Sequence, residues 1–109
     1  MINDIHRIAD HYGFKSQSII LIEEMSEATK AITKLIRILE GGQPSSKQIS
    51  EEEAIENATE EIADVEIMLE QVKYLLHIPD EKLNEIKIAK IKRTLDMMKQ
   101  ENINDISRY

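Results

Sequence analysis

Two pairs of acidic residues interrupt apolar stripes in this 109-residue chain. At about 100° per residue, Glu24 and Glu27 share one face of a helix expected over residues 16–40, and Glu61 and Asp64 share one face of a second helix. Each face also carries aliphatic and alanine side chains suited to packing against another helix: Ile20, Ala28, Ala31 and Leu35 on the first, Ala54, Ala58, Val65, Met68 and Val72 on the second. Ionised carboxylates are costly there unless a cation or hydrogen-bond donors compensate them. The fold must therefore bring these acids to an interior that compensates them.

Composition favours an all-helical domain. Ile, Leu, Glu and Lys dominate, and the chain has one Phe, three Tyr and no Trp, which suits helices better than strands. We expect an all-α four-helix bundle forming a single domain over residues 1–109. A short helix at 3–12 is followed by three long ones at 16–40, 50–76 and 79–100, and residues 101–109 form a frayed tail.

Capping residues mark the expected helix boundaries. Gly13 is predicted to be a left-handed residue that ends the first helix, and Ser16 to be the N-cap of the second. Ser50 opens a capping box with Glu53. Between the second and third helices, residues 43–49 contain Pro and Ser and are predicted to form the connecting loop.

Charge and residue usage exclude several classes of function. The formal net charge of −7 disfavours binding of DNA or RNA through their phosphates. No stretch approaches the ~20 apolar residues of a membrane span, and the absence of cysteine suits a reducing cytoplasm. We expect a cytoplasmic protein without nucleic-acid or membrane partners. The helix over 16–40 is apolar around much of its circumference, which favours a homo-oligomer, either dimer or tetramer.

The acid pairs suit a divalent metal site. Hard cations such as Mg²⁺ take oxygen ligands and are commonly held by a few carboxylates together with substrate phosphates. The candidate ligands are Glu24, Glu27, Glu61 and Asp64, for Mg²⁺ or its substitute Mn²⁺. The alternative is that these acids face solvent in a looser bundle, or form salt bridges with the lysines of the last helix.

A family resemblance adds to this interpretation. Residues 22–28 (Ile-Glu-Glu-Met-Ser-Glu-Ala) followed by 60–65 (Glu-Glu-Ile-Ala-Asp-Val) resemble the Glu-x-x-Glu … Glu-x-x-Asp signature of MazG-like, all-α nucleoside triphosphate pyrophosphohydrolases. Residues 11–17 and 90–95 also resemble small bacterial and phage members, so the resemblance covers about residues 10 to 98. It implies a four-helix bundle that forms dimers or dimers of dimers. It also implies Mg²⁺-dependent hydrolysis of a (d)NTP to the monophosphate and pyrophosphate by water attack at the α-phosphorus.

The resemblance assigns roles residue by residue. Glu24, Glu27, Glu61 and Asp64 match the metal ligands, with Glu24 and Glu61 also counted as catalytic. Glu23 stands beside the motif and is a candidate for orienting or deprotonating the attacking water. Lys90 and Arg93 match basic positions that face the phosphates, and Lys87 belongs to the same basic cluster. Tyr12, Phe14 and Gln17 lie just upstream of the first acids and are candidates for nucleoside binding, although an aromatic pair that fastens the first helix to the bundle is the structural alternative.

Two other functions remain as alternatives. One is a non-catalytic helical interaction or adaptor module, whose acids would point outward. The other is a carboxylate-bridged di-iron bundle, which uses Glu-x-x-His on facing helices; no histidine follows a candidate glutamate at that spacing. His6 and His11 are five apart, so a zinc pair on one helix face is not expected either.

Overall fold

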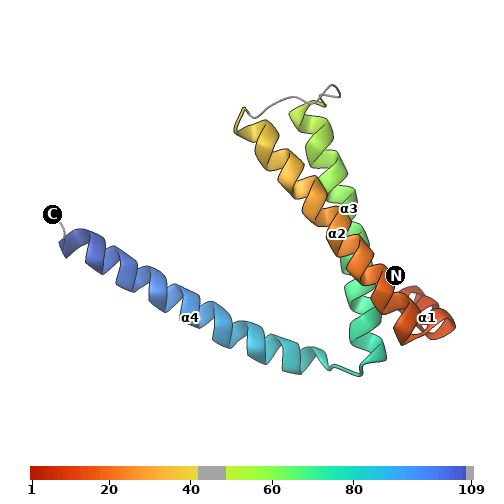
Figure 1. Cartoon of the computed structure of the whole chain (residues 1–109). Helices are drawn as coiled ribbons and strands as arrows, with labels where there is room; N and C mark the ends of the chain where they lie inside the picture. Colours follow the sequence, from red (N-terminus) through yellow and green to blue (C-terminus); the bar gives the residue numbers. More distant parts are fainter. Residues whose placement is uncertain (42–48, 108–109) are drawn as a thin grey trace. The chain divides into compact units, whose positions relative to one another are not determined.

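The computed structural model describes residues 1–41 and 49–107. These residues form four α-helices and no strand: α1 (Ile2–Tyr12), α2 (Phe14–Leu39), α3 (Glu51–Leu75) and α4 (Asp80–Ser107) (Figure 1). The all-α prediction is therefore confirmed, as is the order of one short helix followed by three long ones. Apart from Ile49, the loop predicted over 43–49 lies outside the described residues.

The chain divides into two compact units, Met1–His77 and Ile78–Tyr109. The first holds α1, α2 and α3, and the second holds α4. The single-domain organisation over 1–109 stays a prediction.

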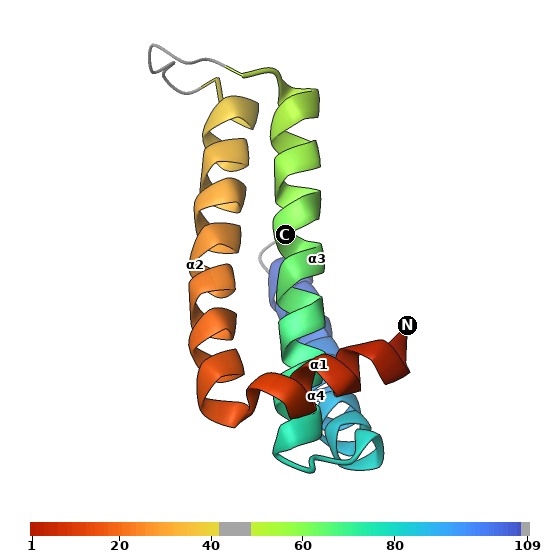
Figure 2. The ribbon, with the colours of Figure 1, turned by 90° about the vertical axis from the view of Figure 1, so that its right-hand side faces the viewer.

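In the first unit, α2 and α3 lie side by side and antiparallel, and α1 crosses one end of the pair (Figure 2). The buried apolar side chains are few and mostly small: Ala9, Leu21, Ala54, Ala58 and Met68. Two buried glutamines, Gln17 of α2 and Gln71 of α3, join them. Alanine side chains such as Ala54 and Ala58 allow helices to approach closely along the contact surface of α2 and α3, called the α2–α3 seam below.

Two helix starts test the predicted caps. The Ser50 hydroxyl accepts a hydrogen bond from the Glu53 N–H at 3.1 Å, as the capping box requires. The prediction that Ser16 caps α2 is wrong, because α2 begins at Phe14 directly after Gly13. Gly13 has a positive φ of 87° with ψ 169°, and its N–H bonds Ala9 O at 2.8 Å. One glycine with positive φ thus ends α1 and starts α2, which leaves no place for a separate cap.

Helix α4 is longer than expected. It begins after Pro79, whose carbonyl accepts the N–H groups of Lys82 and Leu83, and it continues to Ser107 rather than ending near Gln100. Residues 101–107 contain no Gly or Pro to end the helix, so the predicted fraying of this stretch is not seen. The side chains of residues 84–103 are exposed. Within the described part of the chain, no helix has the length and hydropathy needed to cross a membrane.

Candidate metal centre

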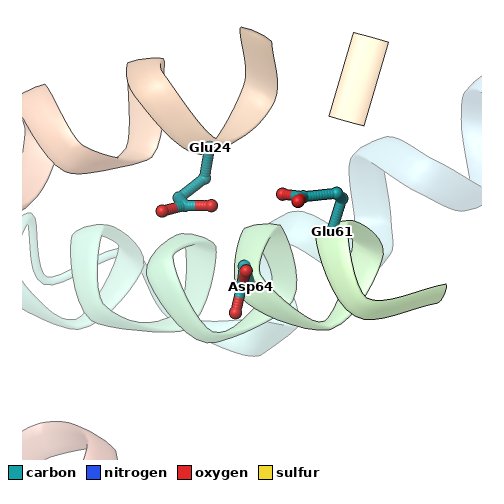
Figure 3. Close-up of side chains that lie close together, drawn as sticks. All are labelled: Glu24, Glu61 and Asp64. Carbon is teal, nitrogen blue, oxygen red and sulfur yellow. The ribbon is translucent and has the colours of Figure 1, made fainter. Parts of the chain in front are cut away.

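Three of the four predicted ligands converge across the α2–α3 seam. Glu24 extends from α2 toward α3, from which Glu61 and Asp64 project one turn apart (Figure 3). One carboxylate oxygen from each residue lies within 4.8 Å of the others. Glu24 and Glu61 are half-buried and Asp64 is exposed. Three oxygen donors that reach one point from two helices fit the ligand preference of a hard divalent cation.

The electrostatics of this cluster favour a proton or a cation. Partial burial is the main cause that raises the pKa of Glu24 above its usual value, followed by repulsion from the Asp64 and Glu61 carboxylates. A hydrogen bond with Asp64 and the charge of Glu27 act in the same direction. Without a cation, the cluster therefore resists full ionisation. A divalent ion bound to these oxygens would remove the cause of the repulsion.

Glu27, the fourth predicted ligand, does not join this cluster. Its side chain is 53% exposed, and its carboxylate accepts a hydrogen bond from Lys30 Nζ at 3.5 Å. It lies instead with Glu61 on the wall of an open hollow of about 230 Å³. Glu61 therefore borders both the acid cluster and the hollow. Glu23, which precedes Glu24 in α2, is exposed. Its role in orienting or deprotonating the attacking water stays a prediction.

The hollow contains basic residues that the sequence did not single out. Its wall is formed by residues of α2 and α3 and by Ile49, which lies between the two helices in the chain: Glu27, Lys30, Ala31, Lys34, Ile49, Ala54, Asn57 and Glu61. Lys30 and Lys34 follow Glu27 at three and seven positions, a spacing that keeps all three on one helix face. This spacing could have indicated from the sequence that Lys30 and Lys34 lie beside Glu27. The basic residues of the last helix are denser and were chosen as the phosphate-binding candidates instead.

The predicted phosphate-binding residues Lys87, Lys90 and Arg93 lie on α4, and their side chains are exposed. They belong to the second unit, so their approach to the acids stays a prediction. Among the predicted nucleoside-binding residues, Tyr12 and Phe14 are exposed at the junction of α1 and α2. Gln17 is buried and donates a hydrogen bond to Gln71 Oε1 at 2.8 Å.

Comparisons with protein-family models, with curated proteins and with solved structures found no match to this chain.

Proposed function

We propose that this protein is a Mg²⁺-dependent nucleoside triphosphate pyrophosphohydrolase, which converts a (d)NTP to the (d)NMP and pyrophosphate. The observation that carries the proposal is the convergence of Glu24, Glu61 and Asp64 from two antiparallel helices. The Glu-x-x-Glu and Glu-x-x-Asp spacing, with its resemblance to MazG-like enzymes, supports the same reaction. The cytoplasmic location expected from the sequence belongs to this proposal as well.

In this proposal the three carboxylates hold Mg²⁺, or Mn²⁺ in its place. A bound Mg²⁺ neutralises phosphate charge and lowers the pKa of a coordinated water. Glu24 and Glu61 are half-buried at the seam, so they are the ligands whose positions the protein controls best. Glu23, exposed beside them, is the candidate base that orients the attacking water.

The hollow beside Glu61 is the proposed place of the substrate. Its lysines, Lys30 and Lys34, can donate to phosphate oxygens, and Asn57 offers both a donor and an acceptor. Lys87, Lys90 and Arg93 remain the candidates drawn from α4. Tyr12 and Phe14, exposed at the other end of α2, remain candidates for contact with the nucleoside.

A homo-oligomer is part of the proposal. Large apolar side chains stay exposed on all the long helices, among them Ile22 (61%), Ile62 (46%) and Ile91 (58%). Exposed apolar surface on this scale marks a protein interface. A second copy of the chain, in a dimer or tetramer, would cover it.

A panel of NTPs and dNTPs with Mg²⁺ or Mn²⁺ tests the reaction, with pyrophosphate and orthophosphate release measured separately. We expect pyrophosphate release that chelation with EDTA abolishes. Glu61→Gln should lose turnover, whereas Glu60→Gln, a matched change at the exposed neighbouring position, should keep it. Unchanged pyrophosphate release by Glu61→Gln would refute the assignment.

The exposed apolar residues also favour a second candidate function, a non-catalytic helical interaction module. Ile88 of α4 is 68% exposed and lies in a helix whose described side chains from residue 84 onward face solvent. This function predicts no nucleotide hydrolysis and no thermal stabilisation by Mg²⁺. The same panel therefore separates the two candidates.

A further inference from the structure

A buried pair of amides joins α2 to α3 outside the acid cluster. Gln17 is 3% exposed and Gln71 is 1% exposed. Gln17 Nε2 donates to Gln71 Oε1 at 2.8 Å, and Gln17 Oε1 accepts from the Ser16 hydroxyl at 3.1 Å. Gln71 Nε2 in turn donates to Met68 Sδ at 3.4 Å. Polar side chains buried this deeply must be paired, so their bonding constrains where the two helices can sit.

The amide pair and the acid cluster share one register. Glu24 follows Gln17 by seven residues, and Asp64 precedes Gln71 by seven residues. In antiparallel helices, the alignment that brings the glutamines together therefore also brings Glu24 opposite Asp64. Seven residues are two helical turns, or about 10 Å along the seam. A slip of α3 against α2 by one turn would separate both pairs at once.

The rest of the seam specifies this register weakly. Near the acids it is lined by small side chains, Ala54 and Ala58 of α3 with Ala28 and Ala31 of α2. Contacts between alanines are similar before and after a slip, because they are neither directional nor large. When they are ionised and no cation is bound, the carboxylates themselves oppose the register, since a slip would move Glu24 away from Asp64. A further contact between α2 and α3 must therefore act beside the bonds of α1 to α3, His6–Glu70 and Tyr74–Asp10, which lie at one end of the pair.

We propose that the Gln17–Gln71 amide pair fixes the register of α2 against α3 and thereby positions Glu24, Glu61 and Asp64 for a divalent cation. The effect on cation binding rests on the proposed function, whereas the effect on register does not. Any slipped alignment would bury two amides without partners, and each would then lose its full hydration without a replacement hydrogen bond. Buried polar residues at single positions set the register of coiled coils in the same way.

The variant that tests this inference removes both amides together. In Gln17→Leu with Gln71→Leu, neither amide remains to be buried without its partner, so stability is retained. Gln17→Met with Gln71→Met is a second version that keeps side-chain length. Leu21→Met, a volume-conserving change at another buried position of α2, is the matched control.

The helix register is measured as a distance between spin labels. The chain has no native cysteine, so Arg37→Cys on α2 and Thr59→Cys on α3, both at exposed positions, carry the only labels. Dilution with unlabelled protein limits the signal to pairs within one chain. We expect a single narrow distance in the parent and in Leu21→Met. One turn of slip moves α3 by about 5 Å along the axis, so the double variants should show added populations whose distances differ from the parent value by a few ångströms and by no more than about 5 Å per turn.

The consequence for the acid cluster is measured by titration with Mn²⁺ alone, followed by electron paramagnetic resonance of the free ion. We expect the double variants to bind Mn²⁺ about tenfold more weakly, the loss typical when the support of metal ligands is removed. Urea unfolding should show that this loss occurs without loss of stability, which a merely structural pair could not produce.

Three results decide the inference. A single distance unchanged in the double variants would overturn it. Added distances with unchanged Mn²⁺ affinity would overturn the positioning role. If the parent protein binds no Mn²⁺, the proposed function fails, and the distance measurement alone decides whether the glutamines set the register.

Discussion

Helix α1 is fastened to α3 by contacts that a single substitution can weaken. His6 Nε2 lies 3.0 Å from Glu70 Oε2, and the His6 ring stacks on Tyr74 with centroids 4.0 Å apart. The Tyr74 hydroxyl donates to Asp10 Oδ2 at 2.8 Å. We predict that Glu70→Gln, which keeps the shape of the side chain but removes its charge, loosens α1 specifically.

The size of the effect follows from the partial burial of the pair. The side chains of His6 and Glu70 are 28% and 19% exposed. Fully buried hydrogen bonds to charged groups contribute about 1.5–3 kcal/mol, and exposed ion pairs about 0.2–1 kcal/mol. An intermediate value of about 1 kcal/mol is expected for the contact between α1 and α3. The ion pair of Glu70 with Lys73, at 2.8 Å, lies within α3 and does not hold α1.

Amide hydrogen exchange is the measurement, because it reports the opening of each helix separately. A loss of about 1 kcal/mol should make exchange in residues 2–12 about fivefold faster, with smaller changes in the middle of α2 and α3. A double-mutant cycle with His6→Ala isolates the coupling between the two side chains. Equal acceleration in all three helices, or none in α1, would refute the reasoning.

The direction in which pH changes the stabilisation by Glu70 follows from the pKa of its carboxyl group. Hydrogen bonds from His6 and then from Lys73 hold the pKa of Glu70 below its usual value, against partial burial, which acts to raise it. A lowered carboxyl pKa stabilises the folded state above the unfolded-state pKa, and this contribution is lost as the pH falls through the folded-state value. The difference between the parent and Glu70→Gln should therefore be full near neutral pH, shrink as the pH falls below the usual glutamate pKa, and vanish only below the lowered folded-state pKa.

Three further changes test other parts of the structure. Asp64→Asn removes one negative charge from the acid cluster, so the thermal unfolding midpoint without metal should rise. Mg²⁺ should not stabilise this variant, whereas it should stabilise the parent by about 2.7 kcal/mol at a hundredfold excess over Kd. Ser50→Ala removes the bond to Glu53 N–H and should cost about 1 kcal/mol in urea unfolding, against a few tenths for the exposed control Thr59→Ala. Gly13→Ala should cost at least about 1 kcal/mol in the same assay, because its φ of +87° strains any side chain although no atom lies within 4 Å of the added Cβ.

Local signals in the sequence were sufficient for most of the helix pattern. Pro79 and the Ser50–Glu53 pair fixed two helix starts, because each acts within one turn of the chain. The Ser16 prediction was wrong because a serine acts as an N-cap only where the backbone is not helical. That point is at Gly13, three residues earlier, and α2 is already helical at Ser16. The helix periodicity placed Glu24, Glu61 and Asp64 on facing stripes, and the structure brings these three together.

Contacts between residues that are distant in the sequence could not be predicted from these local signals. Periodicity gives the face of a helix but not its axial alignment with another helix, so it could not tell that Gln17 meets Gln71. For the same reason it could not separate Glu27 from the other acids, nor place Lys30 and Lys34 beside the hollow. His6 sits five residues from His11, and nothing local indicates its contact with Glu70, which lies 64 positions away.

The α2–α3 seam combines two polar layers with opposite requirements. The hydrogen-bonding groups of Gln17 and Gln71 are paired within the chain, whereas partial burial and then mutual repulsion among Glu24, Glu61 and Asp64 raise the pKa of Glu24. A chain whose register is held by the uncharged layer does not need a cation in order to fold. Mg²⁺ should therefore raise the melting temperature without changing the helical signal in circular dichroism below the transition. A large gain of helix on addition of Mg²⁺ would mean that the acids, and not the glutamines, determine whether α2 and α3 come together.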